Sequence, residues 1–243
     1  MALPPNRLIL FGRLPVPGKC KTRLAAGIGP EAACKFYKAC AEHIMRESMV
    51  CCQTLSPTAV RVKLYFANAA DQEAVQDWVT GLDLPYPIDI EPQAQSEDLG
   101  ARMLAAFENE AAHGGKKIVI FGTDIPDLDA DVMEHAFAAL NRAQVTLGPA
   151  ADGGYYMIGM NKPQPGLFKD IPWSTHDVFE ATKAAATSLR LVFASPDQHH
   201  LPLLEDIDNA TDLKAWHSFT HPPPSSPMYK LVEVVTQILA DVR

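Results

Sequence analysis

The sequence lacks several features that would mark whole classes of protein. It has 243 residues and five cysteines, none of them in a C-x-x-C spacing, and its eight histidines include no H-E-x-x-H pair. A disulfide framework and the common zinc sites are thereby excluded, and the odd cysteine count fits reduced thiols in a cytoplasmic protein. The N-terminus has no basic n-region and no long apolar h-region, and no 18-residue apolar run occurs. We therefore expect no signal peptide and no membrane span.

Positive charge is also scarce. The chain has 21 Lys and Arg against 29 Asp and Glu, a net charge of −8. An acidic chain is a poor partner for nucleic acid or an anionic membrane, so neither partner is expected. The composition is 47% hydrophobic, which at this length suffices for the core of one large domain.

The scarce positive charge is concentrated in residues 13–23, here called the basic loop. It follows an apolar run, Arg7–Phe11, that predicts a buried strand, and it leads into a helix. Its cations are Arg13, Lys19, Lys21 and Arg23. A strand, a Gly/Pro loop and a helix N-terminus are typical of phosphate sites, because loop N–H groups and cationic side chains hold the anion. An ordinary surface loop with solvated charges is the alternative.

The basic loop differs from a Walker A loop, G-x-x-x-x-G-K-[ST]. Gly18-Lys19 resembles the end of that motif, but five residues rather than four separate Gly12 from Gly18. Cys20 stands where the Mg²⁺-binding hydroxyl would be. The sequence therefore excludes a P-loop NTPase.

The apolar pattern along the chain alternates between helix and strand periods. Strands are predicted over residues 7–11, 61–67, 116–122, 144–149 and 190–194, with helices between strands. A short strand is predicted within residues 85–91, and a turn followed by a strand within residues 151–160. This alternation argues for a mostly parallel α/β sheet. The run Lys116–Gly122 is continuously apolar beyond its lysines, which places it at the centre of a sheet covered on both faces. Ligands of such sheets bind beyond the carboxyl ends of the strands, so polar clusters there are candidate site residues.

Carboxylates follow several of these strands. Asp124 comes directly after the predicted central strand, where it can bind Mg²⁺ or serve as a turn residue. Asp208 is a second candidate ligand or the N-cap of the next helix, and Asp206 is a weaker candidate. Asp152 lies in an Asp-Gly-Gly stretch whose glycines allow close approach to a substrate, with a simple tight turn as the alternative.

Gly100 stands in the first turn of a helix that is predicted to begin near Ser96 or Asp98. Glycine is unfavourable in a helix, so its presence predicts that something packs close to the backbone there. A ligand and a neighbouring strand are the two options.

A proline-rich stretch, residues 221–227, precedes the last predicted helix. Ser226-Pro227 is a good helix start. An apolar stripe follows, formed by Met228, Leu231, Val232, Val235, Ile238, Leu239 and Val242. We therefore predict a domain over residues 1–220, a linker over 221–227 and an amphipathic C-terminal helix over 228–243. That helix would dock on the domain or on a second copy of the chain in a homo-oligomer.

Together these stretches resemble the rSAM/selenodomain-associated transferase family, in the GT-A-like superfamily of nucleotide-diphospho-sugar transferases. The resemblance covers roughly residues 7–217 and rests on P-V-P-G-K-C-K-T-R-L (15–24), L-G-A-R-M (99–103), G-T-D-I-P-D-L (122–128), D-G-G-Y-Y (152–156), I-P-W-S-T (171–175) and D-I-D (206–208). Family members usually have Lys at the position of Arg13, which keeps the charge. They commonly have Ser-Asp-Cys-Pro at 123–126 and often Asp-Thr-Pro-Glu-Asp-Leu at 208–213, where this chain has Asp-Asn-Ala-Thr-Asp-Leu.

The resemblance implies a GT-A fold, a Rossmann-like and mostly parallel sheet flanked by helices, to which the C-terminal helix is added. It implies a nucleotide over the basic loop and Mg²⁺ or Mn²⁺ at Asp124, with Asp208 as second ligand. The nucleotide-binding residues would be Arg13, Gly18, Lys19, Lys21, Thr22, Arg23, Gly100 and Arg102. The catalytic residues would be Lys21, Arg23, Asp124 and Asp152.

Three functions compete on this basis. In nucleotidyl transfer, an acceptor phosphate attacks the α-phosphate of a nucleoside triphosphate, and the cations of the basic loop offset the charge together with Mg²⁺. In glycosyl transfer from a nucleotide-diphospho-sugar, Asp152 is the best candidate base for the acceptor hydroxyl. A non-catalytic nucleotide-binding protein is the third option, and the intact carboxylates argue against it. Four cations exceed what a diphosphate needs, so the sequence favours nucleotidyl transfer to a small phosphorylated acceptor.

Overall fold

The computed structural model describes residues 5–241, which form a seven-stranded sheet flanked by helices. The strand order is β3-β2-β1-β4-β6-β5-β7. The strands are β1 (Asn6–Gly12), β2 (Val60–Phe66), β3 (Ile88–Pro92), β4 (Lys117–Gly122), β5 (Val145–Pro149), β6 (Tyr155–Met160) and β7 (Phe193–Ala194). The helices are α1 (Thr22–Ile28), α2 (Pro30–Leu55), α3 (Gln72–Thr80), α4 (Leu99–Ala112), α5 (Ala130–Ala139), α6 (Val178–Ser188), α7 (Ala210–Phe219) and α8 (Pro227–Asp241). Short 3₁₀ helices are η1 (Ala69–Asp71), η2 (Pro165–Leu167) and η3 (Pro196–His199).

The sheet is mostly parallel, as predicted. Four of the six pairings among the described strands are parallel, and β6 runs antiparallel to both of its neighbours, β4 and β5. The predicted central strand, β4, lies in the middle of the strand order. Because β6 runs the other way, its first residue, Tyr155, lies at the edge where β1 and β4 end. The α/β fold class is therefore confirmed, and the reversed strand brings the turn before β6 to the carboxyl edge of the sheet.

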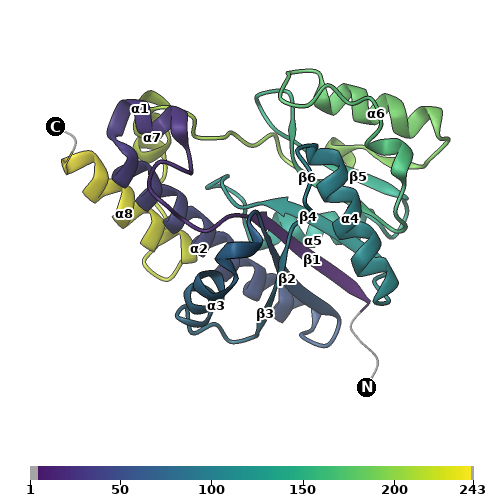
Figure 1. Cartoon of the computed structure of the whole chain (residues 1–243), viewed down its shortest axis with the longest axis horizontal. Coiled ribbons are helices and arrows are strands. Elements are labelled where there is room, and N and C mark those ends of the chain that lie inside the picture. Colours follow the sequence, from purple (N-terminus) through teal and green to yellow (C-terminus); the bar gives the residue numbers. More distant parts are fainter. Residues whose placement is uncertain (1–4, 242–243) are drawn as a thin grey trace.

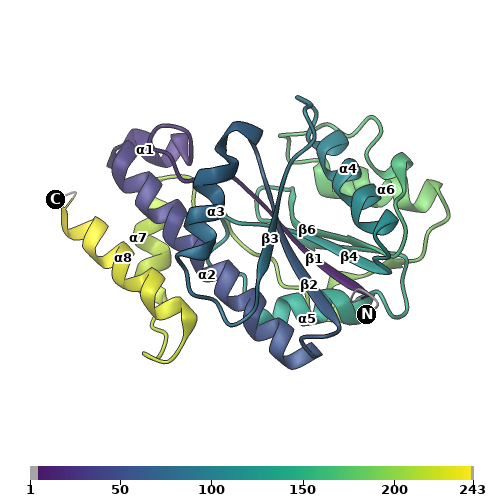
Figure 2. The ribbon, with the colours of Figure 1, turned by 60° about the horizontal axis from the view of Figure 1, so that its bottom comes forward.

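Helices cover both faces of the sheet (Figure 2). In β1, Leu8 and Leu10 belong to the core formed with α2 and α5, whereas Ile9 belongs to the core formed with α4 and α6. Burial of both faces explains why β1 and β4 have continuous apolar runs instead of alternating patterns.

Two elements differ in length from the prediction. Helix α2 has 26 residues, whereas the apolar spacing after Pro30 predicts a helix of about 20 residues with Ala33, Phe36, Tyr37, Cys40 and Ile44 on one face. These five residues are buried. Helix α2 carries four of the five cysteines, and all five are free and buried thiols. Strand β7 has only two residues, where five were predicted. Arg190 has a positive φ of 55°, which is incompatible with the start of a strand.

Helix α8 packs on α2 and α7, and Figure 1 shows α1, α7 and α8 gathered at one end of the sheet. Leu231, Val235 and Ile238 are buried in this contact. The predicted start is confirmed, because the N–H of Met228 donates to Ser226 Oγ at 3.2 Å. Val242, the last residue of the predicted stripe, lies outside the described residues, and the division into domain, linker and helix stays a prediction. Within residues 5–241, no helix is long and apolar enough to cross a membrane.

Candidate active site

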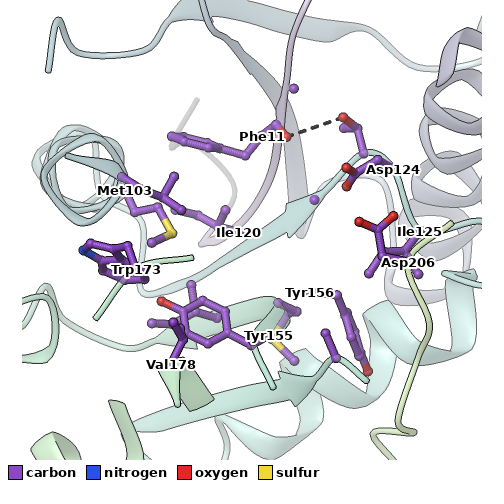
Figure 3. A pocket seen from close by; sticks show the side chains of 18 of the residues that line it. Phe11, Met103, Ile120, Asp124, Ile125, Tyr155, Tyr156, Trp173, Val178 and Asp206 are labelled. Atoms are coloured by element: carbon purple, nitrogen blue, oxygen red, sulfur yellow. Dashed lines mark hydrogen bonds between the residues drawn. The ribbon is translucent and has the colours of Figure 1, made fainter. Parts of the chain in front are cut away.

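A cavity of about 410 Å³ opens at the carboxyl ends of β1 and β4. Its acidic residues are Asp124, Asp152 and Asp206. Figure 3 shows Asp124 and Asp206 on one side and, on the other, apolar and aromatic side chains from several elements, namely Phe11, Met103, Ile120, Tyr155, Trp173 and Val178. The cavity thus has one charged end and one largely apolar end.

A second cavity, of about 230 Å³, shares Arg13, Tyr37, Asp124 and Asp206 with the first. Its other lining residues are Lys19, Cys20, Lys21, Thr22, Arg23 and Asp208. The structure therefore brings most of the predicted phosphate- and metal-binding residues to one place. Gly18 lines neither cavity. Its φ is +77°, so the glycine serves the turn of the basic loop.

Lys21 is the buried cation of the basic loop, with a side chain that is only 6% exposed. Its Nζ lies 3.2 Å from Asp124 Oδ2 and also contacts Asp206 Oδ1. Burial alone would lower the pKa of Lys21, but the carboxylates of Asp124 and Asp206 outweigh burial and raise that pKa. The backbone of Lys21 is left-handed, with φ 46°, directly before α1 begins. That conformation costs a residue other than glycine about 1–2 kcal/mol.

Asp206 reaches the cavity from a segment far along the chain. Leu204 forms a parallel bridge with Ala150, and the N–H of Ala151 donates to the Leu204 carbonyl at 2.9 Å. This extension of the sheet edge carries Asp206 to Lys21 and Asp124. Burial raises the pKa of Asp206 to about 6, with Lys21 opposing the shift and the Asp124 carboxylate adding to it.

Asp208 is not the N-cap of α7. The cap is Asn209, whose Oδ1 accepts hydrogen bonds from the N–H groups of Thr211 and Asp212. The Asp208 carboxylate instead lies 2.6 Å from Arg23 Nη1. The cap alternative for Asp208 is therefore wrong, and its role as a metal ligand stays a prediction.

Tyr37 connects the basic loop to the end of β4. Its hydroxyl accepts a hydrogen bond from the backbone N–H of Arg13 at 3.0 Å and lies 3.0 Å from Thr123 Oγ1. Burial raises the pKa of Tyr37 to about 12, so the hydroxyl stays neutral. Nothing in the local sequence marks this role of Tyr37, because helical periodicity does not distinguish a hydrogen-bonding hydroxyl from a purely packed ring.

Gln93 and Arg102 form the wall of the larger cavity beside β2 and β3. The buried Gln93 Nε2 donates to the carbonyls of Gly12 at 3.2 Å and Tyr65 at 3.0 Å. Gln93 Oε1 accepts from Arg102 Nη1 at 3.0 Å. Gln93 therefore fixes the ends of β1 and β2 and orients the predicted Arg102, although the sequence analysis did not select it.

Gly100 lies outside both cavities. A Cβ at this position would be 2.7 Å from Cζ2 of Trp173 and 3.1 Å from Cβ of Phe168. The close neighbour is therefore an indole from a loop, and neither of the two predicted options. Trp173 itself lines the larger cavity, so Gly100 supports the site indirectly. Asp98 is confirmed as the N-cap of α4, accepting from the N–H of Ala101.

Asp152 lines the larger cavity from the turn between β5 and β6. Its Oδ1 accepts from the N–H of Gly154 at 2.9 Å, which closes the turn. Gly153 has φ +87°, and a Cβ there would lie 2.1 Å from the carbonyl oxygen of His176. Asp152 is thus both a turn residue and a carboxylate of the cavity. The absence of a side chain at Gly153 allows the backbone of His176, in the loop before α6, to pack against the turn.

Asp124 and Asp206 fit a hard divalent cation. One nitrogen, Lys21 Nζ, contacts both carboxylates, so their oxygens converge on a single position for a cation. Figure 3 shows the Asp124 and Asp206 side chains beside each other. Mg²⁺ is usually held by one or two carboxylates together with substrate phosphates and water. Residues 5–241 contain no group of three or more His, Cys, Asp or Glu side chains that could hold a metal. The remaining ligands would therefore have to come from phosphates and water.

The fold and the cavities define an α/β protein with an acidic site at the carboxyl ends of a mostly parallel sheet. A crystal structure from Desulfovibrio desulfuricans G20, assigned provisionally as a nucleotide-diphospho-sugar transferase, is similar with a TM-score of 0.80 and 26% identity over 99% of both chains. This likeness supports the superfamily, whereas membership of the rSAM/selenodomain-associated family stays a prediction.

Two more distant structures are also similar. They are Rv0371c from Mycobacterium tuberculosis H37Rv (TM-score 0.47, 13% identity, 88% of this chain and 98% of that one) and 4-diphosphocytidyl-2C-methyl-D-erythritol synthase from Anaerococcus prevotii DSM 20548 (TM-score 0.49, 8% identity, 85% and 94%). Both TM-scores are below 0.5, so these two structures are too different to support a conclusion about this protein.

The family is identified by a match over residues 50–175, just over half of the chain. The chain belongs to the DUF2064 family, described as an uncharacterized protein conserved in bacteria. The matched segment includes β4 and Asp124, whereas the basic loop and Asp206 lie outside it. No curated protein matches the chain.

Proposed function

We propose that the protein is a divalent-metal-dependent nucleotidyltransferase, which transfers a nucleotidyl group from a nucleoside triphosphate to a small phosphorylated acceptor. One observation carries this proposal: the basic loop and Asp124 meet in one cavity, with Lys21 contacting Asp124 and Asp206. A phosphate-binding loop beside converging carboxylates is the arrangement that phosphoryl chemistry requires. The likeness to a provisionally assigned nucleotide-diphospho-sugar transferase supports a transferase that uses a nucleotide.

The charges of the smaller cavity explain why a metal would be needed. Four cations face three carboxylates there, namely Arg13, Lys19, Lys21 and Arg23 against Asp124, Asp206 and Asp208. The side chains alone leave little net positive charge for a triphosphate.

Each group has a distinct part in the proposed reaction. Arg13, Lys19 and Arg23 bind the phosphates through charge-assisted hydrogen bonds, and Lys21 joins them once it leaves the carboxylates. Asp124 and Asp206 would hold Mg²⁺ or Mn²⁺, which offsets the charge that develops as pyrophosphate leaves. The protein thus contributes positioning and charge stabilisation, which supply most of the catalysis in phosphoryl transfer.

Glycosyl transfer from a nucleotide-diphospho-sugar is the second candidate, and one observation favours it. Asp152 lines the same cavity as Tyr155 and Trp173, whose rings meet edge to face with centroids 6.4 Å apart. Aromatic walls beside a carboxylate suit the apolar face and hydroxyl groups of a sugar. Asp152 would then act as the general base for the acceptor hydroxyl.

A thermal-shift screen separates the two candidates. Triphosphates and nucleotide-diphospho-sugars are each tested with Mg²⁺ and with Mn²⁺. A ligand present at about 100 times its Kd stabilises the folded protein by about 2.7 kcal/mol. Preference for a triphosphate supports nucleotidyl transfer, and preference for a nucleotide-sugar supports glycosyl transfer. Stabilisation by neither class would contradict the proposed function.

A further inference from the structure

Lys21 occupies the position that Asp124 and Asp206 offer to a cation. We propose that its ammonium is a built-in counter-ion: it holds these two carboxylates while the site is empty, and it exchanges to the nucleotide phosphates when a divalent cation takes the carboxylates. The exchange rests on the proposed function for its nucleotide. The counter-ion role concerns the nucleotide-free protein alone.

The two carboxylates need a positive partner in the empty site. Asp206 is largely buried, and the Asp124 charge acts directly on it. Like charges this close disfavour each other's ionised form. Lys21 Nζ contacts both, and its own side chain is only 6% exposed, so the ammonium has few water molecules around it besides these carboxylates. Lys21 therefore compensates both acids in the folded protein.

The same contacts make Lys21 a competitor of a divalent cation. The ammonium touches Asp124 Oδ2 and Asp206 Oδ1, the oxygens that a shared metal would use. A divalent cation bound to these oxygens would lie very close to the ammonium, and like charges at such a distance repel each other strongly. Lys21 and a metal therefore exclude each other from this position.

The rest of the basic loop provides a place for the displaced ammonium. Arg13, Lys19 and Thr22 line the same cavity as Lys21, so phosphates bound there would lie beside it. Among the four cations of the basic loop, Lys21 has a buried side chain, whereas Arg13, Lys19 and Arg23 are exposed. Lys21 is thus the cation that exchanges between carboxylates and phosphates. Because the exchange needs both ligands, metal and nucleotide bind cooperatively. Without nucleotide, the site has a weak affinity for metal.

The test is the affinity of the nucleotide-free protein for Mn²⁺, measured by isothermal titration and by electron paramagnetic resonance. Lys21→Met and Lys21→Gln should each bind Mn²⁺ at least about tenfold more tightly than the wild type, because the competing ammonium is gone. Two different side chains guard against a variant that fails to fold. Adding Asp124→Asn to Lys21→Met should abolish the gain.

Lys19→Gln is the matched control, because it removes the same charge from an exposed position in the same loop. Its Mn²⁺ affinity should change by less than about twofold, since exposed charges are screened. An affinity in both Lys21 variants that equals or falls below the wild-type value would overturn the inference. An equal gain in Lys19→Gln would overturn it too, since the effect would then be general electrostatics. None of these titrations contains nucleotide, so a protein that binds no triphosphate would refute the proposed function and leave the counter-ion result standing.

Discussion

Two clusters of charge, each built around one buried ion, lie on the same sheet. Glu110 of α4 contacts Arg7 Nε, near the start of β1, at 3.0 Å and Lys63 Nζ, in the middle of β2, at 2.7 Å. Its carboxylate also accepts a hydrogen bond from the hydroxyl of Tyr65 at 2.9 Å. Two cations thus face one buried carboxylate, while the exposed Glu91 also lies 3.1 Å from Lys63 Nζ. Glu110 lines neither of the two cavities described above.

The cluster at the carboxyl ends has the opposite balance. One cation, Lys21, faces two carboxylates, Asp124 and Asp206, and both carboxylates line the larger cavity. The comparison shows that burial of charge does not by itself mark a functional site. A surplus of carboxylates beside a cavity, with the pKa of Asp206 raised to about 6, is the feature that indicates a ligand.

The largest expected effect comes from Asp124→Asn. This substitution removes the charge but preserves the size of the side chain, so folding should be unaffected. Pyrophosphate release from the preferred triphosphate should slow by roughly 1,000-fold or more, because a bound metal contributes several kcal/mol of charge stabilisation. Asp89→Asn is the control, since Asp89 pairs with Arg61 near the starts of β2 and β3. Near-normal turnover in Asp124→Asn would show that the cluster of Lys21, Asp124 and Asp206 is not a catalytic site.

Glu110→Gln is the matching substitution in the other cluster. It should lower the free energy of unfolding by about 3 kcal/mol, because Arg7 and Lys63 lose their shared carboxylate in a buried place. Nucleotide affinity per folded molecule should stay at the wild-type value. Chemical denaturation and nucleotide titration together measure both quantities. A selective loss of nucleotide binding would mean that this cluster, too, belongs to a site.

Two solvent-accessible arginine–carboxylate pairs, Arg23–Asp208 and Arg61–Asp89, extend the comparison to smaller effects. Arg23→Ala should weaken nucleotide binding by about 1.5–3 kcal/mol if Arg23 donates to phosphate. Arg61→Ala should leave nucleotide affinity unchanged, although Arg61 Nε contacts Asp89 as closely, at 2.5 Å, as Arg23 contacts Asp208, at 2.6 Å. Neither should change the free energy of unfolding by more than about 1 kcal/mol. If the two variants bound nucleotide with equal affinity, the basic loop would be an ordinary surface loop that does not bind phosphate.

His43 gives the smallest expected effect, a pH slope. This residue of α2 faces the carbonyls of Pro227, Leu128 and Pro126 and lies 3.8 Å from Glu47. Burial lowers the pKa of His43 from 6.5 to about 4. Between these two pH values, His43 is protonated in the unfolded chain and neutral in the folded chain. The resulting stabilisation is complete above pH 6.5 and is lost as the pH falls from 6.5 to 4. Burial raises the pKa of Glu47, which acts in the opposite sense, as stability lost with rising pH.

The measurement for His43 compares free energies of unfolding at pH 7 and pH 4.5. The decrease on acidification should be smaller in His43→Gln than in the wild type. His176→Gln is the control, because its ring is exposed. Identical decreases in all three proteins would show that His43 does not titrate differently on folding.

The fold was largely predictable because apolar periodicity depends on burial alone. The continuous runs of β1 and β4 and the stripe of α8 were identified for that reason. The direction of β6 was not predictable, because a strand has the same period whichever way it runs. Its reversal is what brings Tyr155, the first residue of β6, to the cavity.

The candidate site residues that could be predicted are those whose side-chain type and position after a strand indicate a chemical role. Lys21 and Asp124 follow strands and carry charge, and they do meet. Asp206 was judged weaker than Asp208, because only the bridge between Leu204 and Ala150 decides which of the two reaches Lys21. Contacts between distant segments, such as Tyr37 with the backbone of Arg13, leave no local signal in the sequence.

The most direct test of the account is the affinity for the preferred triphosphate with and without Mg²⁺, in the wild type, Asp124→Asn and Asp89→Asn. If Asp124 holds the metal that joins the carboxylates to the phosphates, Mg²⁺ should tighten binding at least about tenfold in the wild type and in Asp89→Asn. It should have no effect in Asp124→Asn. A Mg²⁺ effect of the same size in Asp124→Asn would place the metal elsewhere and contradict the assignment of this edge of the sheet as the active site.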